Sequence, residues 1–117
     1  MIKSPTQLIQ EAKSGAFCLT AAGARQLKDE DPSLAIIDVR EPDEVAASAI
    51  PGAINIPRGL LEMKIEQLAP AHDKPILLCC GTGGRAALAS RSLREMGYSN
   101  VKIIDCLHQE IAEAFNR

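Results

Sequence analysis

"PILLCCGTGGRAALASRSLREM", residues 75–96, places an apolar run, a glycine-rich segment and a helical pattern in direct succession. The apolar run is typical of a buried strand in a parallel sheet. Beyond the glycines, apolar residues recur with helical spacing at Ala86, Ala89, Leu93 and Met96, and Gly97 ends the pattern. In open parallel sheets, ligands bind beyond the carboxyl ends of the strands. The stretch therefore predicts an α/β fold with a binding loop between a strand and a helix.

The rest of the chain continues this alternation, which predicts a parallel sheet with helices on both faces, a three-layer arrangement. Expected strands cover residues 17–19, 34–39, 53–55, 75–79 and 101–104. Expected helices cover residues 5–14, 20–28, 41–48, 58–68 and 85–96, with a last helix within 105–117. We expect a single domain over 1–117, with an N-terminal helical segment at 1–15 and no internal repeat.

Composition narrows the function classes. The 117 residues are 46% apolar and 24% charged, as in ordinary globular domains, and the net charge is −2 with only 3% aromatic residues. Nucleic acid and anionic membranes are therefore not expected partners. The start of the chain has neither a signal peptide nor a spanning helix, so a cytoplasmic location is expected. The four cysteines show no zinc-type spacing, and no metal or organic cofactor is expected.

The glycine-rich loop has little side-chain bulk, so several backbone N–H groups can turn inward and hold an anion. The next helix adds the positive end of its dipole. A cysteine at the start of such a loop should favour the nucleophilic thiolate. One of the two adjacent cysteines, Cys79 or Cys80, is therefore the candidate nucleophile. The predicted binding residues of the loop are Gly81, Thr82, Gly83, Gly84 and Arg85.

Two adjacent cysteines leave two spacings to Arg85 open. Cys80 gives Cys-x4-Arg, which suggests sulfur transfer, and Cys79 gives Cys-x5-Arg, which suggests phosphate or arsenate chemistry. Cys79 continues the apolar run, whereas Cys80 is the first residue at the loop mouth. The shorter loop also makes a tighter ring, which suits a single sulfur better than a tetrahedral oxyanion.

Two segments carry a family resemblance: "IIDVREPDEVAASAIPGAINIPRGLLEMKI" (36–65) and "PILLCCGTGGRAALASRSLREMGYSNVKII" (75–104). In order and spacing they resemble single-domain rhodanese-like proteins of the thiosulfate sulfurtransferase type. The resemblance implies a five-stranded parallel sheet and sulfur transfer through a cysteine persulfide. Rhodanese-like loops usually have a glycine three residues after the nucleophile and often an arginine five after it, and Cys80 has both. Phosphatases of the Cys-x5-Arg type usually have a histidine before the nucleophile and a serine or threonine after the arginine, where this chain has Leu78 and Ala86. The resemblance therefore implies Cys80 as the catalytic residue.

The resemblance implies an enzyme that takes sulfur from a small anion such as thiosulfate, or from a persulfide, and passes it to a thiol, cyanide or a partner protein's acceptor. Arg85 and Arg58 are the expected anion contacts. Asp38 and Arg40, with Glu41 and Glu44, are expected to order the neighbouring loops, and Cys79 to pack in the core. Two alternatives stay open: a Cys-x5-Arg phosphatase or arsenate reductase on the same fold, and a partner-dependent sulfur carrier.

The chain departs from the family's usual pattern in two places. Ala49 stands where many relatives have a histidine, and "IIDCLHQEIAEAF" (103–115) replaces the usual Gly-Gly pair and later tryptophan. In this second segment we expect Asp105 to cap the last helix. Cys106 is expected either to be a packing residue or to act as a resolving cysteine, which forms a disulfide with a Cys80 persulfide or sulfenate. The residues expected to be solvated are His108, Arg91 and Arg94, and Cys18 is expected in the core.

Overall fold

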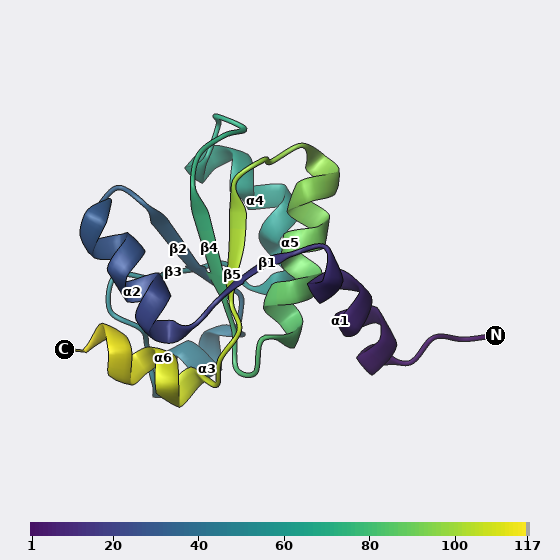
Figure 1. Ribbon diagram of the computed structural model, residues 1–117, viewed down its shortest axis with the longest axis horizontal. Helices are drawn as coiled ribbons and strands as arrows, with labels where there is room; N and C mark the ends of the chain where they lie inside the picture. Colours follow the sequence, from purple (N-terminus) through teal and green to yellow (C-terminus); the bar gives the residue numbers. More distant parts are fainter. Residues whose placement is uncertain (117) are drawn as a thin grey trace.

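The computed structural model describes residues 1–116, and its sheet has five strands, all parallel (Figure 1). The order across the sheet is β1-β5-β4-β2-β3. The strands are β1 Phe17–Leu19, β2 Ala35–Asp38, β3 Ile54–Asn55, β4 Ile76–Cys79 and β5 Val101–Ile104. The predicted strands are confirmed to within a residue at each end, and so is the parallel sheet.

Helices cover both faces of the sheet, as predicted (Figure 1). They are α1 Pro5–Ser14, α2 Ala21–Glu30, α3 Pro42–Ala47, α4 Leu61–Leu68, α5 Gly84–Met96 and α6 His108–Phe115, with a 3-10 turn, η1, at Arg58–Leu60. Helices α1, α4 and α5 pack on one face, and α2 and α6 on the other. The predicted last segment, 105–117, begins its helix only at His108, and its final residue lies outside the described residues.

Strand β4 shows how the two faces are built. Successive side chains of a strand point to opposite faces of the sheet. Ile76, Leu78 and Cys80 therefore join the core under α5 and α4, while Leu77 and Cys79 join the core under α2 and α6. Both cores are mainly aliphatic, with one buried aromatic side chain in each, Tyr98 under α5 and α4 and Phe115 under α2 and α6. The alternation gives the adjacent cysteines different surroundings.

Three expectations about single residues are wrong. Cys18 is exposed, because β1 is an edge strand of three residues with little covering it. Asp105 does not cap α6, whose N-cap is Leu107, and its carboxylate instead pairs with Lys13 of α1. Arg94 is not solvated charge, since its guanidinium donates to the carbonyl oxygens of Ala12 and Gly15 at the end of α1. A cation at this end complements the helix dipole.

Among residues 1–116 we find no helix with the length and apolar character that a transmembrane span requires.

Candidate active site

The two adjacent cysteines differ in what surrounds their sulfur atoms. Cys79 is fully buried in β4, and its thiol donates a weak hydrogen bond to the carbonyl of Ile37 at 3.7 Å. Burial, with a smaller contribution from the charge of Asp38, raises the pKa of Cys79 far above the usual range of a thiol. Cys79 is therefore held as a neutral core residue.

Cys80 lies one residue later, where the strand ends and the loop begins. Its Sγ accepts the backbone N–H of Gly83 at 3.1 Å and that of Ala86 at 3.3 Å. Ala86 lies in the first turn of α5, where backbone N–H groups have no partner within the helix. The sulfur thus occupies the positive end of the helix, where a negative charge is stabilised. These two N–H groups can stabilise the negative sulfur of a thiolate or a persulfide.

The loop can reach this geometry because of Gly83. Its φ is +94°, in the left-handed region that favours glycine. A Cβ at this position would lie 2.5 Å from Oδ1 of Asp105, which approaches the loop from the end of β5. Gly83 is therefore required both for the turn and for the close packing of Asp105.

Arg85 follows the loop, in the first turn of α5, and forms a two-pronged ion pair. Its Nη1 donates to Oε1 of Glu44 at 2.6 Å, and its Nη2 donates to Oε2 at 3.0 Å. The guanidinium lies against the loop backbone, because Nη2 is 3.1 Å from where a Cβ of Gly81 would stand. This hydrogen-bonded pair lowers the pKa of Glu44 to about 2. The predicted anion contact is thus bound to a carboxylate of α3.

Asp38 and Arg40 form a buried pair beside the loop, only 1% and 4% exposed. Nη2 of Arg40 donates to Oδ2 of Asp38 at 2.8 Å and also to the carbonyl of Ser48 at 2.7 Å. Nη1 donates to the carbonyl of Glu44 at 3.3 Å. These carbonyl groups belong to α3 and its C-cap. The pair therefore ties α3, and with it Glu44, to the carboxyl end of β2.

Arg58, the second predicted anion contact, is paired with a carboxylate in this structure. Its backbone N–H donates to the carbonyl of Val39, but its Nη1 donates to Oε2 of Glu62 at 2.8 Å. Ser92 of α5 donates to the same carboxylate oxygen at 2.6 Å. Arg58 therefore belongs to a bridge from η1 to α4 and α5.

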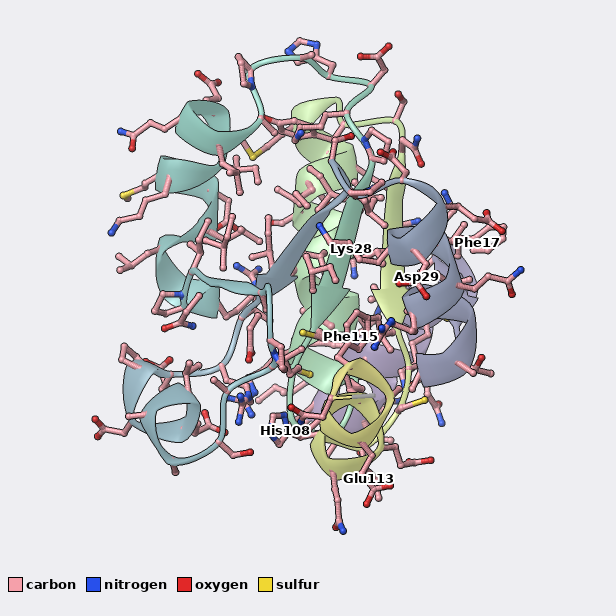
Figure 2. All side chains as sticks on the ribbon, turned by 90° about the vertical axis from the view of Figure 1, so that its left-hand side faces the viewer. Phe17, Lys28, Asp29, His108, Glu113 and Phe115 are labelled. Carbon is pink, nitrogen blue, oxygen red and sulfur yellow. The ribbon has the colours of Figure 1, made fainter. Side chains whose placement is uncertain are left out.

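The expectation that His108 is solvated is wrong, because the residue is half-buried beside the loop. Its backbone N–H donates to the carbonyl of Gly81 at 2.9 Å, and its Nε2 lies 2.9 Å from Oγ of Ser48. Figure 2 shows the ring between α6 and α3. Burial, followed by the charge of Arg40, lowers the pKa of His108. The sequence offered one signal: the chain departs from the family's usual pattern at this segment.

Cys106 is not brought to Cys80 by any recorded contact among residues 1–116. It is half-buried and packs against the core under α2 and α6, whereas Cys80 belongs to the core under α5. In the same residues, no cluster of three or more histidine, cysteine or acidic side chains could hold a metal ion.

Known proteins share this arrangement. The rhodanese-like domain family matches residues 20–107. Two Bacillus subtilis proteins are similar in sequence and carry provisional names. The sulfur carrier protein YrkF is 35% identical over 66% of this chain and 40% of its own length. The sulfurtransferase YtwF is 33% identical over 73% of this chain and 81% of its own length. The chain thus spans less than half the length of the first relative.

A solved structure agrees over almost the whole fold. A Rhodopseudomonas palustris protein of unknown function, described as a possible tyrosine phosphatase, superposes with a TM-score of 0.87 and 28% identity. The match covers 97% of this chain and 92% of that protein. The family match extends over both segments that carry the sequence resemblance and over the Cys80 loop. The chain belongs to the rhodanese-like sulfurtransferase family.

Proposed function

We propose that this chain is a sulfurtransferase that carries sulfur on Cys80 as a persulfide. The observation that supports this most is the position of the Cys80 sulfur, which accepts N–H groups of Gly83 and Ala86 at the start of α5. Donors aimed at a sulfur stabilise the charge that it carries as a nucleophile and as a persulfide. No cofactor is needed, because the sulfur travels covalently on the cysteine.

In the first step, the Cys80 thiolate attacks the outer sulfur of a donor such as thiosulfate. A new S–S bond forms between Cys80 and that sulfur. The bond between the outer sulfur and the sulfonate sulfur breaks, and sulfite leaves with the electron pair. Cys80 is then a persulfide whose negative charge lies on its terminal sulfur.

In the second step, an acceptor thiolate or cyanide attacks the terminal sulfur. The Cys80 sulfur leaves with the electron pair and returns to the thiolate, and the acceptor becomes a persulfide or thiocyanate. Electrons and atoms balance without an outside oxidant. The cycle needs Cys80 in its reduced form, which suits a reducing compartment such as the cytoplasm.

A phosphatase or arsenate reductase on this fold would use Cys79, and its surroundings do not favour that role. Cys79 belongs to the core under α2 and α6, on the opposite face of the sheet from α5, whose first turn would hold an oxyanion. Its raised pKa keeps the thiol protonated at neutral pH. We therefore favour Cys80 and the shorter spacing to Arg85.

The proposal is tested by turnover with thiosulfate and cyanide, measured as thiocyanate, for the wild type, Cys80→Ser and Cys79→Ser. We expect Cys80→Ser to lose all turnover and Cys79→Ser to keep the chemical step. Unchanged turnover in Cys80→Ser would refute the mechanism. Hydrolysis of p-nitrophenyl phosphate that depends on Cys79 would instead support the phosphatase. A single loading of sulfur without turnover would support the carrier.

A further inference from the structure

Arg85, the cation that follows the loop after Cys80, is already paired with a carboxylate before any sulfur donor binds. Both terminal nitrogens of Arg85 bind the two carboxylate oxygens of Glu44, at 2.6 and 3.0 Å. Two-pronged arginine–carboxylate pairs are the stronger and more directional kind. Because the pair holds both prongs, an incoming anion has to displace Glu44 or do without this arginine.

Other basic side chains near the loop also have carboxylate partners. Lys13 binds Oδ1 of Asp105 at 2.8 Å, and that oxygen approaches Gly83. The remaining two pairs are Arg40–Asp38 and Arg58–Glu62, each at 2.8 Å. Each of these cations is therefore balanced by a carboxylate. The first turn of α3 adds the acidic Asp43 next to Glu44. These pairs therefore add no net positive charge around the loop after Cys80.

A nucleophilic thiolate already carries one negative charge, and thiosulfate carries two. Repulsion between them is usually offset by cations at the site, since like charges at contact distance cost free energy. The backbone N–H groups of Gly83 and Ala86 donate to the Cys80 sulfur, so these two groups serve the nucleophile. The sulfonate end of thiosulfate needs a separate positive partner, and Arg85 is the one nearest the loop.

We propose that Glu44 is a specificity-determining residue, which neutralises Arg85 and makes the site discriminate against doubly charged sulfur donors. The favoured donor class is a sulfane carrier with a single negative charge, such as a thiosulfonate, R–SO2–S⁻. Its outer sulfur is transferred to Cys80 as from thiosulfate, and a sulfinate leaves with the electron pair. This inference rests on the proposed sulfurtransferase function and names its substrate class.

Glu44→Gln is the informative substitution. The side-chain oxygen of Glu44 also accepts the backbone N–H of Glu41 at 3.0 Å and so caps α3. Glutamine keeps that acceptor and the side-chain length, removes the charge, and replaces Oε2, which accepts from Nη2 of Arg85, with an NH2 donor. Because the pKa of Glu44 is about 2, the carboxylate is charged at every practical assay pH. The substitution therefore tests charge and not protonation.

The first measurement compares kcat/KM for thiosulfate and for methanethiosulfonate at low ionic strength. In Glu44→Gln, we expect the ratio of the two kcat/KM values to shift toward thiosulfate by about three- to tenfold, mostly through a lower KM for thiosulfate. This shift should become smaller in added salt. Asp29→Asn is the matched control, because it removes the carboxylate of the Arg25–Asp29 pair on α2. An unchanged donor ratio in Glu44→Gln would overturn the proposal.

A second measurement does not depend on sulfur transfer. Iodoacetate and iodoacetamide have similar size and differ by one charge. Their reaction with Cys80 is followed as alkylation of the tryptic 65–85 peptide, and alkylation that persists in Cys80→Ser is subtracted. Glu44→Gln should raise the iodoacetate rate relative to the iodoacetamide rate by about threefold or more. Equal ratios in both proteins would refute the charge effect. If neither donor loads sulfur on the wild type, the proposed function fails, and this ratio still decides the role of Glu44.

Discussion

At the level of single residues, Gly83 links the shape of the loop to its chemistry. Its N–H donates to the Cys80 sulfur, its φ is +94°, and the carboxylate of Asp105 fills the space of a Cβ. A side chain here would strain the backbone and also displace the donor. The shape of the loop and the hydrogen bond to Cys80 therefore both require a residue without a Cβ at position 83.

Gly83→Ala should lower stability by about 1–2 kcal/mol from backbone strain and lower turnover by about tenfold or more through the displaced N–H. Gly52→Ala is the control, because Gly52 has φ +80° but an added Cβ meets nothing within 4 Å. That variant should lose a similar amount of stability and keep its turnover. The measurements are urea unfolding and thiocyanate formation. Equal loss of turnover in both variants would contradict the account.

The acid dependence of the Glu44 pair is a second residue-level prediction. The folded-state pKa of Glu44, about 2, lies below its unfolded value of 4.5, so its contribution is present above pH 4.5 and is lost as the pH falls toward 2. The pair is partly exposed, with side chains 38% and 39% accessible, so the contribution should be below about 1 kcal/mol. Wild type and Glu44→Gln should therefore differ in unfolding free energy by a constant amount above pH 5 and converge below it. A difference that grows on acidification would refute this.

At the level of elements, α6 is tied to the loop after Cys80 through His108, whose backbone N–H donates to the carbonyl of Gly81. The ring is near Ser48, and the charges around it are those of Arg40, Asp38 and Glu44. Since the folded-state pKa is lowered, the unfolded chain binds more protons below pH 6.5, and stability falls as the pH falls. The unfolding free energy of the domain should therefore fall in mild acid.

His108→Gln should remove that slope and keep a side chain able to bond Ser48. Urea midpoints of the wild type should drop between pH 7.5 and 5.5 by more than those of the variant. The midpoints are measured for both proteins by following ellipticity during urea unfolding at each of the two pH values. Parallel shifts in the two proteins would show that His108 does not cause the slope.

Helix α1 lies before the segment that matches the family, yet it packs on the loop. Ile9 approaches Gly84 closely, and Lys13 pairs with Asp105 at 2.8 Å. Lys13→Met should cost about 0.5–1 kcal/mol, because the pair is only partly exposed. Lys3→Met, which breaks the exposed Lys3–Glu11 pair of the same segment, should cost less. Thermal unfolding decides the order, and a larger loss in Lys3→Met would be the contrary result.

For the whole molecule, the sequence was sufficient where signals are local. Apolar runs and caps predicted the strands, the helices and the parallel sheet, and period-two alternation along β4 explains why Cys79 and Cys80 differ. Contacts between distant segments were not predictable: Arg85 and Glu44 are 41 residues apart, and Lys13 and Asp105 are 92 apart. The same limit explains the error at Arg94, whose partners lie in the end of α1.

Only the tertiary arrangement shows that the cations around the loop are already paired. The sequence offers Arg85 and Arg58 as anion contacts, because an arginine beside a glycine-rich loop suits that role. It does not show that Glu44 and Glu62 bind them. The charge of the site is therefore a property of the fold and not of the loop motif.

The central claim, that Cys80 carries the sulfur, is tested most directly by intact-protein mass after incubation with thiosulfate or methanethiosulfonate. The wild type and Cys79→Ser should each gain the mass of one sulfur atom, and Cys80→Ser should gain none. Subsequent cyanide should remove the added mass. A gain that survives in Cys80→Ser, or that disappears in Cys79→Ser alone, would contradict the account.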